Sequence, residues 1–138
     1  MRLLLIEDNP DDVAIVERLA RSSPLRVDLV CAADGREALP LFSDGAGPID
    51  LVLLDLNLPG IAGIDVLRQM KDDFRLRDIP VIVVSGSQHD EDILKGLALG
   101  AHSHIVKPIG NCDFAWMVTS VAKAQPRLLQ LRDMQGGR

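Results

Sequence analysis

The sequence predicts an α/β protein in which helices cover both faces of a doubly wound, five-stranded parallel sheet with strand order 2-1-3-4-5. Short apolar runs of strand length alternate with segments in which apolar residues recur at helical spacing. Polar turn residues separate the two kinds of segment, and each crossover is long enough to contain a helix. Because such crossovers are right-handed, the alternation favours one sheet with helices on each side.

The first strand and the first helix are expected within residues 2–22. Residues 2–6 are a short apolar run bounded by polar residues, as in a parallel strand that is covered on both faces. Asn9 is a favourable helix N-cap, and Pro10 suits the first helical position. The helical pattern then continues until Ser22, where a Ser-Ser-Pro sequence ends it.

The second strand is expected at residues 27–31, and the second helix follows at residues 34–42. Asp34 and Glu37 have the spacing of a capping box, which indicates that the helix begins there. The segment 44–48 is rich in glycine and ends in proline, so it is expected to end the helix.

The rest of the chain repeats this alternation. The further expected strands are residues 49–54, 80–84 and 104–106. The further expected helices are residues 63–74, 90–99 and 111–124. Gly100 follows the fourth helix at the usual position of a C-terminal cap. This order of elements is that of flavodoxin-like sheets.

Composition and charge indicate a globular domain with its own core. The chain has 138 residues, of which 47% are hydrophobic and 25% charged. Its net charge of −5 argues against nucleic acid as a direct partner. The apolar run near the N-terminus is too short for a signal peptide, and no run approaches the length of a membrane span. We therefore expect a cytoplasmic protein that does not bind the membrane.

Residues that can handle a phosphoryl group stand at the ends of four expected strands. They are Glu7 and Asp8, Asp55, Ser85, and Lys107. The carboxyl ends of parallel strands lie along one edge of the sheet, and the first and third strands flank its topological switch point. Three carboxylates, a hydroxyl and an ammonium are therefore expected in one crevice.

The three carboxylates are expected to bind a cation or to raise the pKa of one member, because like charges repel. Mg²⁺ prefers oxygen ligands, which suits Asp8 and Asp55 directly and Glu7 through water. The loop after Asp55 offers a backbone carbonyl as a further ligand. Asp55 is then a candidate nucleophile toward a phosphoryl donor, with Lys107 neutralising the transferring oxygens and Ser85 donating a hydrogen bond to them.

In order and spacing, these residues resemble the receiver domains of two-component response regulators. The segments that carry the resemblance are IEDN at 6–9, LDLNLPG at 54–60, VSG at 84–86, GA at 100–101 and VKP at 106–108. Each motif is weak alone, but the combination is highly specific. The resemblance covers residues 1–124 and leaves residues 125–138 as a C-terminal tail or a short extra helix.

The resemblance implies a role for each residue of the crevice and implies Mg²⁺ as the cofactor. The implied roles are phosphoacceptor for Asp55, metal-site acids for Glu7 and Asp8, metal ligand through the backbone carbonyl for Asn57, signalling hydroxyl for Ser85, and phosphoryl-contacting lysine for Lys107. In this family the Lys-Pro peptide bond, here Lys107–Pro108, is commonly cis. Such a protein is not an enzyme but a phosphoacceptor that assists its own phosphorylation and dephosphorylation.

The resemblance also implies partners. The phosphoryl donor would be a histidine kinase, and the opening motif and the loop after Asp55 look most like receivers paired with bacteriophytochrome or hybrid histidine kinases. We expect a stand-alone regulator whose output is a change of partner or of oligomeric state. A homodimer would use the face formed by the fourth helix, the fifth strand and the fifth helix. The residues expected on that face are Leu94, Leu97, Ala98, Ala115, Trp116 and Thr119.

One residue of the fifth strand and three acids of the first helix stand outside this set of roles. His104 stands where the family's switch residue is usually Tyr or Phe. It either fills the aromatic position or, because imidazole titrates near neutral pH, makes signalling sensitive to pH. Asp11 and Asp12, with Glu17, are expected to form a solvent-exposed face of the first helix.

The sequence is also compatible with other functions. A phosphatase of the haloacid-dehalogenase type carries a second acid two positions after its nucleophile, and Asn57 occupies that position here. The missing acid counts against catalytic turnover. The remaining alternatives are a phosphorelay intermediate or phosphate sink, and a receiver-like interaction module that has lost phosphorylation.

Overall fold

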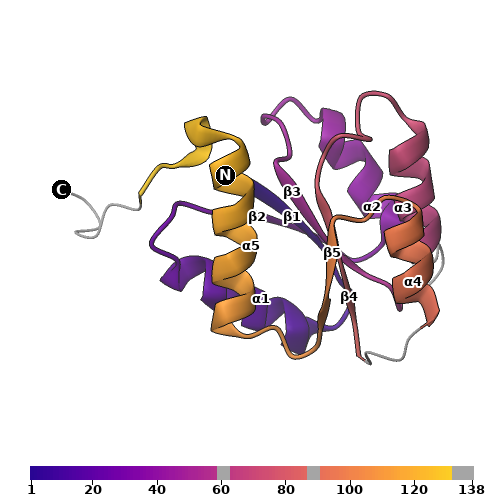
Figure 1. Ribbon diagram of the computed structural model, residues 1–138, viewed down its shortest axis with the longest axis horizontal. Coiled ribbons are helices and arrows are strands. Elements are labelled where there is room, and N and C mark those ends of the chain that lie inside the picture. Colours follow the sequence, from indigo (N-terminus) through magenta and orange to yellow (C-terminus); the bar gives the residue numbers. More distant parts are fainter. Residues whose placement is uncertain (59–62, 87–90, 132–138) are drawn as a thin grey trace.

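One five-stranded parallel sheet forms the centre of the protein. The computed structural model describes residues 1–58, 63–86 and 91–131, so the expected positions Pro59, Gly60 and Asp90 and the tail beyond Leu131 lie outside the described residues. The strands are β1 (Arg2–Ile6), β2 (Asp28–Ala32), β3 (Leu51–Asp55), β4 (Val81–Ser85) and β5 (Ser103–Val106). All neighbouring strands pair in parallel, in the order β2-β1-β3-β4-β5, which confirms the predicted fold class (Figure 1).

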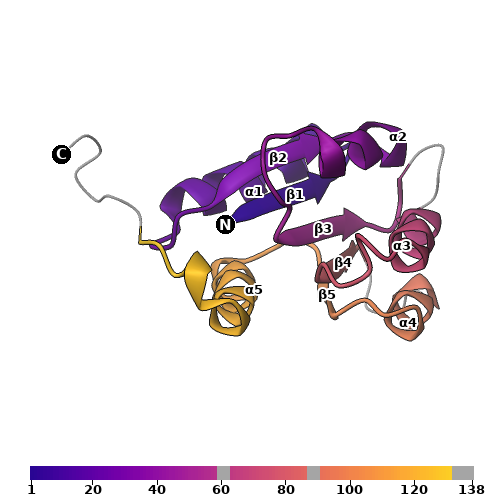
Figure 2. The ribbon, with the colours of Figure 1, turned by 90° about the horizontal axis from the view of Figure 1, so that it is seen from above.

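Helices cover both faces of this sheet, because alternate residues of each strand point to opposite sides. The helical elements are α1 (Pro10–Ser22), α2 (Gly35–Ala38), α3 (Gly63–Asp72), α4 (Glu91–Ala98) and α5 (Asn111–Ala124), with 3₁₀ turns η1 (Leu39–Ser43) and η2 (Pro126–Leu128). In Figure 1, α1 and α5 lie to the left of the sheet and α2, α3 and α4 to the right, and Figure 2 shows the same separation from above.

Each face of the sheet has its own hydrophobic core. Leu3, Leu5 and Leu53 point toward α1 and α5, where they pack in one cluster with Val16 and Phe114. The alternate strand residues pack in a second cluster with α3 and α4. Its strand members include Leu4, Ile6, Val52, Leu54 and Val83, and its helix members include Val66, Leu67, Met70 and Ile93. Burial on both faces explains why the central strands β1, β3 and β4 are nearly continuous apolar runs in the sequence.

Two prolines account for differences between the expected and the observed elements. The expected helix at 34–42 is instead the short α2 followed by the 3₁₀ turn η1. Pro40 has no amide hydrogen for an α-helical bond to the preceding turn, so the regular helix ends before it. Pro80 similarly lacks a donor for the sheet, and β4 begins one residue later, at Val81.

An aspartate side chain delays the start of β3. The strand was expected from residue 49, but its pairing with β1 begins at Leu51. Oδ2 of Asp50 accepts the amide hydrogen of Arg2 at 2.8 Å, so a side chain replaces a backbone carbonyl at this point of the ladder.

The C-terminal segment packs against the amino edge of the sheet. Leu128 in η2 is buried, and Nη2 of Arg127 donates to Oδ1 of the buried Asp50 at 3.0 Å. The chain then forms an antiparallel bridge between Leu131 and Leu25. Among the described residues, no helix is both long enough and apolar enough to span a bilayer.

Gly63 gives a test of how tightly α3 packs on the end of β3. A Cβ added at Gly63 would lie 2.8 Å from the Cα of Leu56 and closer still to the carbonyl oxygen of Asp55. Gly63→Ala should therefore lower the free energy of unfolding by about 1–3 kcal/mol, measured by urea denaturation, because the backbone must move. The matched control is Gly86→Ala, where the new Cβ would meet no atom within 4 Å. Equal stability of the two variants would contradict this packing argument.

Candidate functional site

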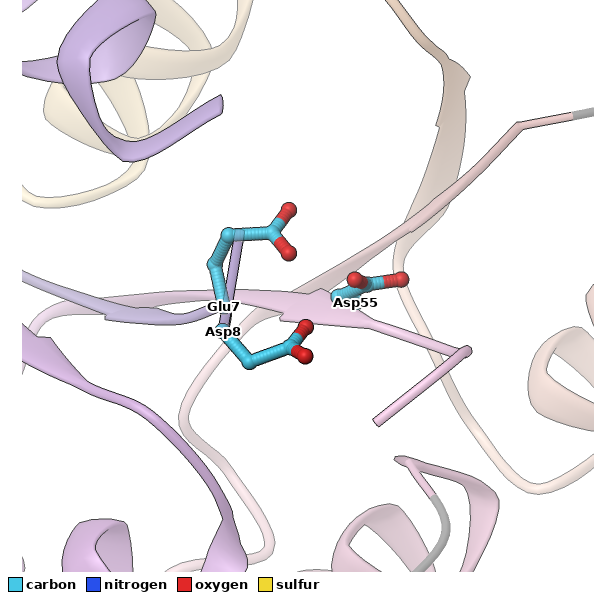
Figure 3. Close-up of side chains that lie close together, drawn as sticks. All are labelled: Glu7, Asp8 and Asp55. Atoms are coloured by element: carbon cyan, nitrogen blue, oxygen red, sulfur yellow. The ribbon is translucent and has the colours of Figure 1, made fainter. Parts of the chain in front are cut away.

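Three carboxylates meet at the carboxyl edge of the sheet. Glu7 and Asp8 follow β1 directly, and Asp55 is the last residue of β3. Because β1 and β3 are neighbours and Ile6 pairs with Leu54, the residues after them lie side by side. Carboxylate oxygens of all three residues lie within 4.8 Å of one another, and Figure 3 shows the three groups converging. The crevice predicted at the topological switch point is present.

The carboxylates differ in burial. Glu7 is 5% exposed and Asp55 is 3% exposed, whereas Asp8 is exposed. Two buried anions so close together are unfavourable unless a cation or a proton compensates them. An all-oxygen donor set with one solvent-facing member fits a hard divalent ion such as Mg²⁺, which keeps several waters. The residues present therefore fit the expected cofactor.

Lys107 provides the positive charge nearest to the buried carboxylates. It follows β5, and its peptide bond to Pro108 is cis, as expected. Its Nζ lies 2.7 Å from Oε1 of Glu7 and 3.2 Å from Oδ2 of Asp55. A third carboxylate, Oδ2 of Asp12, lies 2.9 Å from the same nitrogen. One ammonium thus contacts acids from β1, α1 and β3.

These contacts shift the proton equilibria of the site. Burial, followed by the hydrogen bond with Asp55, raises the pKa of Glu7 to about 7, although Lys107 acts in the opposite direction. Burial alone would lower the pKa of Lys107, but its carboxylate partners outweigh burial and raise it above its usual value. Lys107 is therefore a permanent cation, while Glu7 binds and releases a proton near neutral pH.

Asp55 is held in a defined orientation. The backbone N–H of Asn57 donates to Oδ1 of Asp55 at 2.9 Å, and Nζ of Lys107 donates to Oδ2 at 3.2 Å. The Asn57 side chain itself is exposed. Each carboxylate oxygen of Asp55 thus has its own donor, which fixes the plane of the carboxylate.

Ser85 and His104 lie on the strands beyond Asp55. Ser85 ends β4 and is fully buried, one residue after Val84, which pairs with Asp55. Its carbonyl oxygen accepts the backbone N–H of Lys107 at 2.8 Å. His104 lies on β5 and is exposed to solvent. The structure therefore brings Ser85 next to the carboxylates, whereas His104 is part of the edge strand's outer surface.

The interpretation of Asp12 as a solvent-exposed residue is wrong. Its side chain is 23% exposed and forms an ion pair with Lys107. Helical periodicity placed Asp12 on the polar face of α1, and that face usually contacts water. However, α1 begins just after the end of β1, so its first turn lies against the crevice. The short distance in sequence between Glu7 and Asp12 was the signal that could have identified it.

A family model for the response regulator receiver domain matches residues 3–119. The chain belongs to this family. Receiver domains accept phosphoryl groups from histidine kinases, bind Mg²⁺ through acidic residues, and act in signalling rather than as conventional enzymes. The predicted resemblance is therefore confirmed.

Curated relatives contain the same receiver domain in different settings. The chemotaxis protein CheY of Pseudomonas aeruginosa is 32% identical over 108 residues, which cover 78% of this chain and 85% of CheY. The "Probable cyclic di-GMP phosphodiesterase" of Vibrio cholerae is 34% identical over 108 residues, but this chain spans only 23% of its length. The name of the longer protein therefore gives no activity to this receiver domain.

Solved structures of response regulators are similar to this receiver domain in fold. The bacteriophytochrome response regulator AtBRR shares 31% identity, with 88% of this chain and 91% of AtBRR covered and a TM-score of 0.76. The Mn²⁺-bound form of response regulator Rcp1 shares 26% identity, with 96% of this chain and 99% of the Rcp1 chain covered and a TM-score of 0.74.

The raised pKa of Glu7 predicts an unusual pH dependence of stability in the absence of divalent metal. Between about pH 4.5, the ordinary value, and about pH 7, the folded receiver domain retains a proton that the unfolded chain has released. Raising the pH through this window should therefore lower the free energy of unfolding, by on the order of 2 kcal/mol from this group. Glu7→Gln should remove that component, measured by urea denaturation at both ends of the window.

The control is Glu17→Gln, which changes an exposed glutamate on α1. The assignment to Glu7 fails if the wild-type protein and Glu7→Gln lose the same stability across the window.

Proposed function

We propose that this receiver domain is a phosphorylation-controlled switch in which Asp55 is the phosphoacceptor. A histidine kinase would supply the phosphoryl group: the bond between phosphorus and the kinase histidine breaks, and a bond forms between phosphorus and a carboxylate oxygen of Asp55. The observation that carries this proposal is the placement of Asp55. It is the buried carboxylate of the cluster that itself ends a central strand, and each of its oxygens accepts from a separate donor, as the oxygens of Glu7 also do.

The acids around Asp55 support a metal-dependent reaction. Glu7, Asp8 and Asp55 would hold Mg²⁺, with the backbone carbonyl of Asn57 as a further ligand. When bound, Mg²⁺ would neutralise charge on the phosphoryl oxygens during transfer. Lys107 remains protonated because its pKa is raised, so it is always available to donate to a phosphoryl oxygen.

The output would be a change at the surface formed by α4, β5 and α5. A phosphoryl group on Asp55 adds about −1.5 to −2 charges at neutral pH. We propose that Ser85 and His104 reorganise around this charge, because Ser85 is buried beside Asp55 and the Lys107 amide links it to β5. The surface that would respond is defined here as the α4–β5–α5 face.

Exposed apolar side chains on the α4–β5–α5 face support a protein partner there, and we propose a second copy of this chain. Leu94 is 72% exposed and Trp116 is 49% exposed, and Leu97 is also exposed. Ala98 and Ala115 are exposed beside them, and Thr119 is half-buried. Aromatic and large apolar residues are enriched at the centres of protein interfaces.

A bacteriophytochrome is the kinase that we propose for this receiver. The support is the similarity to AtBRR, a bacteriophytochrome response regulator, across most of both chains. Because histidine kinases take their phosphoryl group from ATP, we place this exchange in the cytoplasm.

Substitution of Asp55 tests the phosphoacceptor. The wild-type protein, incubated with Mg²⁺ and acetyl phosphate, should gain the mass of one phosphoryl group, and Asp55→Asn should gain none. The control is Asp65→Asn, an aspartate on α3 that is half exposed, which should be labelled like the wild type. Full labelling of Asp55→Asn would refute the assignment. No labelling of the wild type, even by a purified histidine kinase, would favour an interaction module that has lost phosphorylation.

Substitution of Leu94 tests the proposed dimer. With the phosphoryl mimic beryllofluoride, light scattering should report a shift from one protomer to two. Leu94→Ser should raise the dimer dissociation constant about tenfold or more, as expected for an interface anchor. Leu129→Ser changes another exposed leucine, outside the α4–β5–α5 face, and should leave the constant unchanged. A dimer that is weakened only by Leu129→Ser would place the interface on the C-terminal segment instead.

A further inference from the structure

The Asp12 carboxylate differs from the other two partners of Lys107. A lysine ammonium has three protons, and the three contacts at 2.7, 2.9 and 3.2 Å account for all of them. Glu7 and Asp55 belong to the carboxylate cluster that could hold a cation. Asp12 is not a member of that cluster within the part of the chain that the structure describes. It therefore contacts Lys107 from outside the expected metal site.

The start of α1 fixes Asp12 in this position. Asn9 caps the helix by accepting the N–H of Asp11 at 2.9 Å, and Pro10 occupies the first helical position. An acidic residue in the first turn is also stabilised by the helix dipole. The side chain of Asp12 is consequently directed into the crevice by a rigid helix start, not by a mobile loop.

Apolar side chains line one part of the space around the contact between Asp12 and Lys107. A small cavity at this point is lined by both residues, by the carboxylates Glu7 and Asp55, and by apolar side chains that include Ile15, Val84 and Ile109. Side-chain exposures of 23% for Asp12 and 19% for Lys107 indicate that water competes only in part. An ion pair in such surroundings is stronger and better localised than one on an open surface.

Occupation of the site would leave Asp12 as the remaining carboxylate partner of Lys107. A divalent cation would take oxygens of Glu7 and Asp55, and a phosphoryl group on Asp55 would make one of its oxygens the bridging oxygen of an acyl phosphate. Both events withdraw acceptors from Lys107, whereas neither involves Asp12. Without Asp12, the flexible lysine side chain would be free to turn toward solvent at the time when its charge is needed.

We propose that Asp12 is a positioning residue, which holds the ammonium of Lys107 beside Asp55 while metal and phosphoryl group occupy the other carboxylates. Asp12 acts through Lys107 and does not contact the transferred group. This inference rests on the proposed role of Asp55 as phosphoacceptor, and it adds a residue to that site.

A mutant cycle on the phosphorylation rate tests the proposal. Asp12→Ala should slow labelling of Asp55 by acetyl phosphate and Mg²⁺ about tenfold, the loss expected for one hydrogen bond to a charged group. In a Lys107→Ala background, the same substitution should have no further effect on the labelling rate, because the ammonium that Asp12 holds is absent. The matched control is Asp11→Ala, which removes an exposed acid from the same helical turn and should label at the wild-type rate.

The mutant cycle tests the positioning role of Asp12 separately from the phosphoacceptor role of Asp55. If Asp12→Ala labels as fast as the wild type, or slows equally with and without Lys107, the positioning role is refuted while the phosphoacceptor stands. If it fails to fold, Asp12→Asn is used in its place, because it removes the charge and preserves the shape of the side chain.

A second measurement tests the positioning role without phosphorylation. Reaction of the amine of Lys107 with acetic anhydride is followed by peptide mass spectrometry, with the exposed Lys123 as internal reference. Added Mg²⁺ should leave the relative reactivity of Lys107 low in the wild type and in Asp11→Ala, and should raise it several-fold in Asp12→Ala. Equal reactivity of Lys107 in all three proteins would overturn the proposal even if Asp55 is not phosphorylated.

Discussion

The contact between Lys107 and the buried carboxylates is the constraint on which the rest of the site depends. Glu7 and Asp55 are almost fully buried at the ends of adjacent strands, where two negative charges without a partner would oppose folding. The ammonium of Lys107 compensates them at 2.7 and 3.2 Å. The raised pKa of Glu7 indicates that this compensation is incomplete, because one carboxyl group still tends to hold its proton near neutral pH. Such a site favours the arrival of a further cation.

The strand order makes this contact possible. Glu7, Asp55 and Lys107 are far apart in the sequence, but parallel strands bring all their carboxyl ends to one edge of the sheet. With β1, β3, β4 and β5 in consecutive positions, the acids of β1 and β3 lie on one side of Ser85 and Lys107 lies beyond it. A lysine side chain is long enough to reach back over β4 to the carboxylates. A shorter cation at residue 107 would leave Glu7 and Asp55 unpaired.

The sequence was sufficient to predict most of this arrangement, because the central strands β1, β3 and β4 are buried apolar runs and the carboxylates, Ser85 and Lys107 stand at or just after the ends of strands. Boundaries were less predictable where a single residue changed the hydrogen bonding: Pro40 replaced part of a helix by a 3₁₀ turn, and the side chain of Asp50 delayed the start of β3. Asp12 was misassigned for a different reason. Periodicity separates the polar face of a helix from the apolar face, but it does not reveal that the first turn of α1 lies beside an edge of the sheet that is itself polar.

The backbone near Lys107 suggests how a charge on Asp55 would reach the α4–β5–α5 face. The amide of Lys107 donates to the carbonyl of Ser85, so the lysine and the serine share one segment of the β4–β5 ladder. If Ser85 moves toward a phosphoryl group, this hydrogen bond must move with it or break, and either change alters the position of β5 and of His104. A lysine held only by Glu7 and Asp55 would lose its carboxylate partners in the same event, and the phosphoryl oxygens alone would have to keep it in place. The third acceptor, Asp12, belongs to the rigid start of α1 and stays fixed. The lysine side chain would then stay in place, and β5 would be the part that moves.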